Sequence, residues 1–271
     1  MRTEAAGRRR PGERLPAFLA LPALAGLAFL LLPLAGLLLR TPWAELPDRL
    51  AAPGVLAALR LSLFSATAAT GLCLLLGVPL AWLLARTRFP GRGMVRALVT
   101  VPLVLPPVVG GVALLLVYGR RGLIGAWLDS TFGITLPFTT GAVVVAEAFV
   151  AMPFLIIAVE GALRAADPRY EEAAATLGAS RWTTFRRVTL PMVGPGVAAG
   201  AVLCWSRALG EFGATITFAG NFPGRTQTMP SAVYLALEQD LEAAIVLSLL
   251  LLVVSVAILA GLRDRWVGGL R

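Results

Sequence analysis

Long runs of apolar residues, separated by short polar segments, are the main feature of the chain. Six runs are long enough to span a bilayer as helices, because roughly 20 apolar residues at about 1.5 Å each cross a hydrocarbon core of about 30 Å. We predict spanning helices at residues 17–39, 57–85, 97–118, 140–163, 193–219 and 243–262. Prolines inside them, including Pro106, Pro107 and Pro153, predict kinks. The pattern therefore predicts an all-α polytopic membrane protein.

The first apolar run could be taken for a signal peptide because arginines precede it. Its length exceeds the roughly 7–15 residues of a signal core, and Leu39-Arg40-Thr41-Pro42 offers no small-residue cleavage site. We therefore expect a retained helix. The expected organisation is a cytoplasmic N-terminus, first helix and periplasmic loop at residues 1–54, a transmembrane domain at 55–262 and a cytoplasmic tail at 263–271.

The chain carries 24 arginines, no lysine and no histidine, and its net charge is +9. Basic residues near the ends of spans are retained in the cytoplasm. Seventeen arginines fall before the first span, in the second and fourth loops and after the last span, whereas five fall in the other loops. Both termini and the fourth loop are therefore expected in the cytoplasm. This distribution accounts for the basic charge, so we expect no nucleic-acid partner.

Missing residue types limit the chemistry of the chain. Without histidine there is no imidazole base or histidine metal site, and without lysine there is no Walker A motif, so any ATP hydrolysis needs another chain. Cys73 and Cys204 lie within apolar runs and are expected to be buried small residues. We expect no catalytic residue, no metal site and no bound cofactor.

A polar segment between the fourth and fifth runs carries the signals of two short helices. Asp167 can accept hydrogen bonds from the first turn of a helix that begins with Pro168. Glu171 and Glu172 lie near the positive end of this helix, and Gly178 is suited to end it. A helix-turn-helix of this size is rigid enough to transmit a push, so the segment is a candidate docking surface.

In the second short helix, Ser180 is the expected cap and Pro191 the expected stop or bend. The segment resembles the EAA loop that membrane subunits of bacterial ABC importers seat in a cleft of a separate ATPase, with Val188 replacing the usual isoleucine. The residues that carry the resemblance are Glu172, Ala173, Ala174, Gly178, Leu190 and Pro191. The resemblance implies that these residues, with Asp167 and Glu171, couple the chain to its ATPase. The alternative is a solvated loop whose alanines reflect helix propensity and whose arginines reflect topology.

Two opposite charges, Arg207 and Glu211, lie within the fifth predicted span. Charges at that depth cost about 2.5–3.5 kcal/mol on insertion scales, so they usually face the bundle interior or a wet cavity. Four residues apart, the two can share a helix face, and Glu147 in the fourth span is an alternative partner for Arg207. They form either a pathway or gate element, with Gly210 and Thr215, or an internal ion pair that fixes packing.

The segment after the fifth span is rich in hydrogen-bond donors and is expected to face the periplasm. The series R-A-L-G-E-F-G-A-T, followed by A-G-N-x-P-G-R-T-Q-T-x-P-x-A-V-Y, resembles permease subunits of molybdate ABC importers, and its first part is shared with sulfate permeases. The resemblance implies contacts with a substrate-binding protein, and the same donors suit an oxyanion route. The candidates are Asn221, Arg225, Thr226, Gln227 and Thr228. An ordinary hydrophilic hairpin is the alternative.

Together the two resemblances cover residues 55–262 and imply a type I ABC importer fold that moves molybdate across the cytoplasmic membrane of a bacterium or archaeon by alternating access. They imply a homodimer, two cytoplasmic ATPase subunits and a periplasmic or lipid-anchored molybdate-binding protein. A permease for sulfate, thiosulfate or tungstate is the alternative within the class. From another class, a stand-alone ion-coupled carrier would use Glu147, Arg207 and Glu211 as a relay. A membrane enzyme lacks support because no nucleophile–base pair is present.

Overall fold

The computed structural model describes residues 17–267, and every regular element within them is helical. The elements are α1 (Ala17–Arg40), α2 (Leu46–Leu50), α3 (Val55–Arg86), α4 (Arg92–Val104), α5 (Pro107–Tyr118), α6 (Gly125–Phe132), α7 (Thr140–Ala165), α8 (Arg169–Thr176), α9 (Arg181–Thr184), the π-helical turn η1 (Phe185–Thr189), α10 (Leu190–Leu209), α11 (Gly213–Ala219), α12 (Met229–Gln239) and α13 (Leu241–Val267). The predicted cytoplasmic N-terminus before Ala17 and the end of the predicted tail, residues 268–271, lie outside the described residues.

Five of the described helices are long and apolar enough to cross a membrane, or six if the bent pair of α4 and α5 counts as one span. This confirms the predicted all-α polytopic class. The predicted first, second, fourth and sixth spans correspond to α1, α3, α7 and α13. The helix α1 belongs to a compact unit that ends at Thr41, and the other described helices belong to a second unit that begins at Pro42.

The third predicted span, residues 97–118, is wrong as one continuous helix. The axes of α4 and α5 are bent by 117°. Between them Leu105 is extended, with φ −70° and ψ 128°, and Pro106 is extended with ψ 133°. The proline ring disfavours the helical region for the residue before it, and Pro106 and Pro107 each lack the N–H that a continuing helix needs. Two adjacent prolines therefore break the helix rather than kink it.

The prediction that Pro191 stops the second short helix is also wrong. One continuous helix runs from Arg181 to Leu209 through α9, η1 and α10. In η1 the backbone N–H of Leu190 donates to the carbonyl oxygen of Phe185, five residues back. This wider turn lies immediately before the proline, where a regular helical turn would lose a hydrogen bond and clash with the ring. The fifth predicted span therefore starts twelve residues earlier than expected.

The helices α3, α7 and α10 pack closely through small residues. A Cβ atom added to Gly77 of α3 would lie 3.2 Å from a methyl carbon of Leu155 in α7, and one added to Gly200 of α10 would lie 3.0 Å from the Cβ of Ala158. Small residues allow this close approach between membrane helices. Both cysteines are buried and free in the same core, as predicted.

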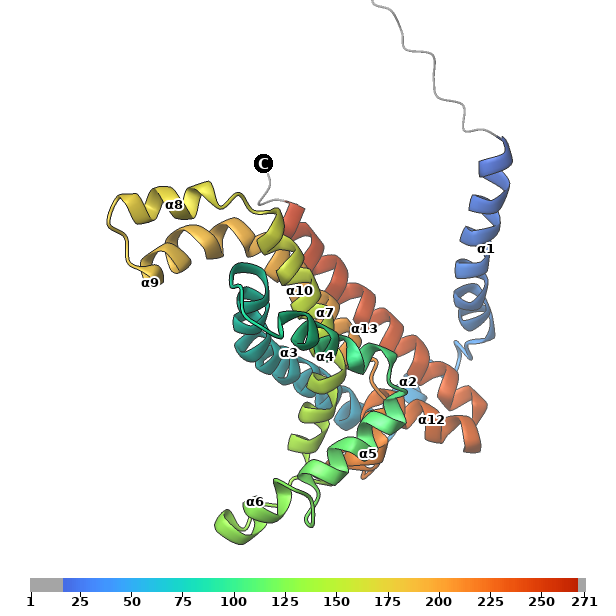
Figure 1. Cartoon of the computed structure of the whole chain (residues 1–271). Helices are drawn as coiled ribbons and strands as arrows, with labels where there is room; N and C mark the ends of the chain where they lie inside the picture. Colours follow the sequence, from blue (N-terminus) through green and yellow to red (C-terminus); the bar gives the residue numbers. More distant parts are fainter. Residues whose placement is uncertain (1–16, 268–271) are drawn as a thin grey trace, which may run out of the picture. The chain divides into compact units, whose positions relative to one another are not determined.

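Within the second unit, the hairpin of α8 and α9 and the short helix α6 lie at opposite ends of the long helices (Figure 1). The segment between α3 and α4 lies at the hairpin end, because Arg86 pairs with Glu171 at 3.0 Å. The segment between α11 and α12 lies near the start of α7, because Thr140 Oγ1 donates to the carbonyl oxygen of Arg225 at 2.9 Å. The two arginine-rich loops that we predicted on one side of the membrane thus share one end of this unit.

Candidate functional site

The first predicted helix of the polar segment is α8, and its start has the expected backbone bonding. Asp167 Oδ1 accepts a hydrogen bond from the N–H of Arg169 at 3.0 Å. Pro168 occupies the cap position immediately before the first helical residue. Glu171 and Glu172 lie in the first turn, where the partial positive charge of the free N–H groups favours carboxylates.

Gly178 forms the turn between α8 and α9. Its φ of +81° lies in the left-handed region, which glycine adopts without steric cost. The N–H of Ala179 donates to the carbonyl oxygen of Ala174, five residues back, at 3.0 Å, which is the 6→1 hydrogen bond of a Schellman motif. Ser180 Oγ then caps α9 by accepting from the N–H of Thr183 at 3.2 Å. Local backbone bonds therefore fix the geometry of the hairpin, which we define as residues 167–184.

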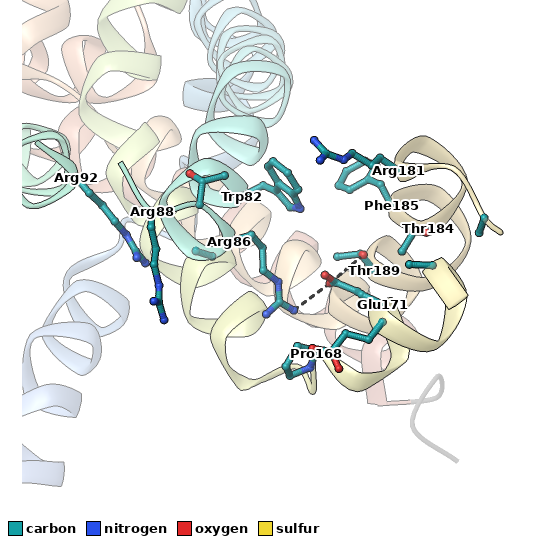
Figure 2. Close-up of a pocket in the computed structure, with 15 residues that line it drawn as sticks. Trp82, Arg86, Arg88, Arg92, Pro168, Glu171, Arg181, Thr184, Phe185 and Thr189 are labelled. Carbon is teal, nitrogen blue, oxygen red and sulfur yellow. Dashed lines mark hydrogen bonds and ion pairs between the residues drawn. The ribbon is translucent and has the colours of Figure 1, made fainter. Parts of the chain in front are cut away.

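The two glutamates of α8 have different surroundings, which the sequence did not distinguish. Glu171 Oε1 pairs with Nη2 of Arg86 at 3.0 Å and accepts from Oγ1 of Thr189 at 3.0 Å (Figure 2). This carboxylate therefore joins α8 to the end of α3 and to η1. The side chain of Glu172 is exposed and has no hydrogen bond or ion pair with any described residue.

Arg86 and Thr189 are site residues that sequence reasoning missed. Arg86 counted only as a topological charge, although an arginine at the end of a span and a glutamate in the next loop on the same side form a chemically suitable pair. Arg86 and Glu171 lie 85 residues apart in the chain, so a single sequence could not show that they meet.

Three large apolar side chains are exposed on the hairpin, and the sequence analysis did not single them out. The exposed fractions are 61% for Tyr170, 88% for Leu177 and 67% for Trp182. The ring of Trp182 stacks on Phe185 with centroids 5.9 Å apart, which holds it in place. Exposed aromatic and aliphatic side chains on an otherwise polar surface are typical of a protein contact.

The other predicted coupling residues divide between the hairpin and the next spanning helix. In α8, Ala173 is exposed and Ala174 is half-buried. Leu190 and Pro191 are exposed in the first turn of α10, beyond η1. The structure therefore gathers the predicted residues from Asp167 to Gly178 on one short hairpin and leaves the last two outside it.

The predicted shared helix face of Arg207 and Glu211 is wrong, as is the predicted end of the fifth span. Helix α10 ends at Leu209, Gly210 follows, and Glu211 lies in the break before α11. The ion pair nevertheless forms, with 2.5 Å between Arg207 Nη2 and Glu211 Oε2. Glu211 Oε1 also accepts the N–H of Ala214 at 2.8 Å, so this buried carboxylate caps α11.

Glu147 pairs with a serine rather than with Arg207. It is 1% exposed in α7, and Oγ of Ser65 in α3 donates to its Oε1 at 2.8 Å. Its Oε2 and the Oγ1 of Thr215 in α11 are buried without a hydrogen-bond partner among the described residues. Ser62, one turn before Ser65, accepts the first N–H of α12 at 2.7 Å. Sequence reasoning missed both serines, although two polar residues three apart in an apolar run were a usable signal.

The five candidates between α11 and α12 differ in exposure. Arg225 is exposed and Asn221 is half-buried, whereas Thr226, Gln227 and Thr228 are buried. Thr226 Oγ1 accepts the N–H of Phe222 at 2.9 Å, which closes the turn. The buried side chains support the loop itself, so the surface that another molecule could contact here is centred on Arg225.

The described residues contain no group of three or more histidine, cysteine, aspartate or glutamate residues that could hold a metal ion. Their features are apolar spanning helices, a buried carboxylate at a helix break, and an exposed hairpin braced against the spans. This arrangement defines the membrane subunit of a multi-chain transporter. The chain belongs to the family of binding-protein-dependent transport system inner membrane components, whose family pattern matches residues 77–269. It is a non-catalytic, multi-pass subunit of the cytoplasmic membrane in a system that includes an ATPase and a binding protein.

Relatives of this chain include permeases named for molybdenum and for sulfate. It is 48% identical to the molybdenum transport system permease protein ModB of Mycobacterium tuberculosis, over 94% of this chain and 96% of that protein. It is 43% identical to ModB of Escherichia coli, over 70% of this chain and 83% of that protein. The sulfate transport system permease protein CysT of Escherichia coli is 38% identical, over 85% of this chain and 84% of that protein.

Among solved structures, a bacterial ABC transporter involved in the import of alginate has a chain that matches with a TM-score of 0.71 at 19% identity, over 92% of this chain and 93% of that chain. This similarity confirms the predicted ABC importer fold. Family membership favours the importer subunit over the alternative of a carrier that acts alone.

Proposed function

We propose that the chain is the permease subunit of an ATP-driven molybdate importer, present as two copies with two ATPase subunits and a molybdate-binding protein. The substrate assignment rests on sequence identity. The chain is 48% identical to the mycobacterial permease named for molybdenum over 94% of its length, and 38% identical to the sulfate permease CysT over 85%. Sulfate is the second candidate, because CysT is still 38% identical.

The hairpin of α8 and α9 is the coupling site in this proposal. Exposed Glu172, Leu177 and Trp182 would contact the ATPase, and Glu171 would hold the hairpin to the membrane helices. Because Glu171 bonds to both Arg86 and Thr189, a displacement of α8 pulls on α3 and on η1 together. A braced hairpin transmits motion between two packed states, whereas a solvated loop would absorb it.

The break between α10 and α11 is the proposed gate element. Glu211 is both the ion-pair partner of Arg207 and the cap of α11, so a rotation of α10 changes the position of α11 as well. Gly210 lies within this break, and the hydroxyl of buried Thr215, which has no hydrogen-bond partner among the described residues, lies on the helix that would move. Alternating access then needs only two packings of the same helices, biased by ATP.

The orientation in this proposal places the hairpin and both termini in the cytoplasm. The seventeen-to-five distribution of arginines supports it. The segment between α11 and α12 then faces the periplasm, where the exposed Arg225 is the proposed contact for the binding protein.

The test is uptake of labelled molybdate by proteoliposomes that contain the chain, its ATPase and its binding protein. We expect ATP-dependent molybdate uptake that excess sulfate reduces only weakly. Uptake of sulfate in preference to molybdate would replace the substrate assignment, and uptake without the ATPase would overturn the coupling role.

A further inference from the structure

A cavity of about 850 Å³ lies between the hairpin and the end of α3. Its walls come from the segment between Trp82 and Arg92, from α8 and the turn that follows it, and from α9 with η1 (Figure 2). It shares Glu172 with the proposed ATPase contact, but neither Leu177 nor Trp182 lines it. Nothing in the proposed coupling role requires such a space.

The lining of this cavity has an excess of positive charge. Arg86, Arg88, Arg92 and Arg181 line it, against Glu171 and Glu172. Arg86 is paired with Glu171, but no described carboxylate lies within ion-pair distance of the other three arginines. Figure 2 shows the side chains of Arg88 and Arg92 extending in the same direction, although like charges repel. An anion between or beside them would offset that repulsion.

Buried guanidinium atoms in this lining lack acceptors. Nε of Arg86 and Nε of Arg92 are both inaccessible to solvent and have no hydrogen-bond partner among the described residues. A buried donor without an acceptor costs about 1–3 kcal/mol, more when the group is charged. Both Nε atoms are covered by neighbouring atoms, so the groups that an anion in the cavity would meet are the outer guanidinium nitrogens of the lining arginines.

Arg92, the first residue of α4, lines the cavity. This helix of 13 residues begins after Gly91, which has no capping side chain, and its first turn contains no acidic residue. The free N–H groups of such a turn favour a negative charge. Trp82 and Phe185 supply apolar lining beside the arginines, so the cavity suits an anionic group attached to an apolar stem as well as a free anion.

We propose that this cavity is a binding site for a phosphate-type tetrahedral oxyanion, with Arg88 and Arg92 as its principal ligands. The oxyanion is presented by the headgroup of an anionic phospholipid or is a free anion in solution. The bound anion neutralises the segment between α3 and α4 and braces it against the hairpin. This site is additional to the proposed transport function and does not depend on which substrate is carried.

Titration of the full chain with phosphatidylglycerol and with phosphatidylcholine, followed by native mass spectrometry, tests the site. We expect at least about tenfold tighter binding of the anionic lipid, equivalent to about 1.4 kcal/mol. The Arg88→Gln/Arg92→Gln variant is expected to lose this preference. Arg186→Gln/Arg187→Gln is the matched control, because it removes the same charge from exposed positions of η1 that do not line the cavity.

Competition with inorganic phosphate distinguishes the two sources. Displacement of the lipid by millimolar phosphate identifies a free-anion site, and retention of the lipid identifies a headgroup site. If the double glutamine variant fails to fold, the test uses the Arg88→Lys/Arg92→Lys variant instead. This variant keeps the charge but loses the planar guanidinium fork, and its preference for the anionic lipid is compared with that of the wild-type chain. Selectivity for neither anion, an equal loss in the control variant, or complete loss of binding once the ATPase is docked would each overturn the proposal.

Discussion

Adjacent glutamates in α8 allow the stability of the hairpin to be separated from its docking. Glu171→Ala leaves Arg86 without its carboxylate and Thr189 without its acceptor, so we expect the free energy of unfolding to fall by about 1–3 kcal/mol. Glu172→Ala removes an exposed carboxylate and should change the free energy of unfolding by less than about 0.5 kcal/mol. Thermal unfolding of both variants in one detergent compares them. Equal midpoints would contradict the brace that we assign to Glu171.

At the same scale, Glu147 tests whether a buried carboxylate serves transport or packing. Glu147→Gln keeps an acceptor for Ser65, so uptake in the assembled transporter is expected to stay within about twofold of the wild type. Glu147→Ala removes that acceptor and leaves a cavity, which should cost about 1–3 kcal/mol of stability. Uptake and unfolding midpoints are measured on the same preparations. A glutamine variant that folds normally but does not transport would show that the ionisable group itself is needed.

At the scale of elements, the turn between α8 and α9 depends on backbone conformation rather than on space. A Cβ atom at Gly178 would meet nothing within 4 Å, but the residue has φ +81°. Gly178→Ala is therefore expected to cost about 1–2 kcal/mol through strain alone and to weaken ATPase co-purification several-fold. Gly161→Ala in α7 is the control, since that position is equally open and has no positive φ. A similar effect of both substitutions would refute the role of the turn.

A second element-scale contact joins α2 to the start of α13 outside the membrane. Arg49 Nη1 donates to Asp240 Oδ2 at 2.7 Å, and this hydrogen bond holds the pKa of Asp240 below its usual value. A carboxylate whose pKa is lower in the folded state stabilises the fold above its unfolded pKa, and this contribution is lost as pH falls through the folded value. As the pH is lowered below about 4, the thermal unfolding midpoint should therefore fall more steeply in the wild type than in Asp240→Asn.

The breaks between elements show where reading the sequence was sufficient and where it was not. Hydropathy and length located the spans because a bilayer imposes the same length on every helix. Hydropathy and length did not distinguish a kink from a break at Pro106. The 117° bend there also depends on the packing of α5 against α11. The two helices approach so closely that a Cβ atom at Gly111 would lie 2.6 Å from Thr217. Nor did hydropathy and length show that Glu211 lies in a break between two helices, since the same charge spacing suits one continuous helix.

For the whole molecule, local signals were predictable and long-range partners were not. Asp167, Gly178 and Ser180 act through backbone groups a few residues away, and the structure contains each of these bonds. The partners Arg86 of Glu171 and Ser65 of Glu147 lie 85 and 82 residues away, so only the fold brings them together. Exposure of an apolar residue in a loop is likewise a property of the folded chain.

Assembly of the whole transporter tests that exposure. Leu177 is 88% exposed on the hairpin and Leu123 is 85% exposed in the segment between α5 and α6, at the other end of the same unit (Figure 1). Neither side chain is buried by folding, so Leu177→Ser and Leu123→Ser should both leave the unfolding midpoint of the isolated chain nearly unchanged. Leu177→Ser is expected to weaken ATPase binding by about tenfold or more, as loss of an anchor at a protein interface does, whereas Leu123→Ser should not affect it. ATPase affinity measured in nanodiscs distinguishes them, and unchanged affinity in Leu177→Ser would move the docking surface away from the hairpin.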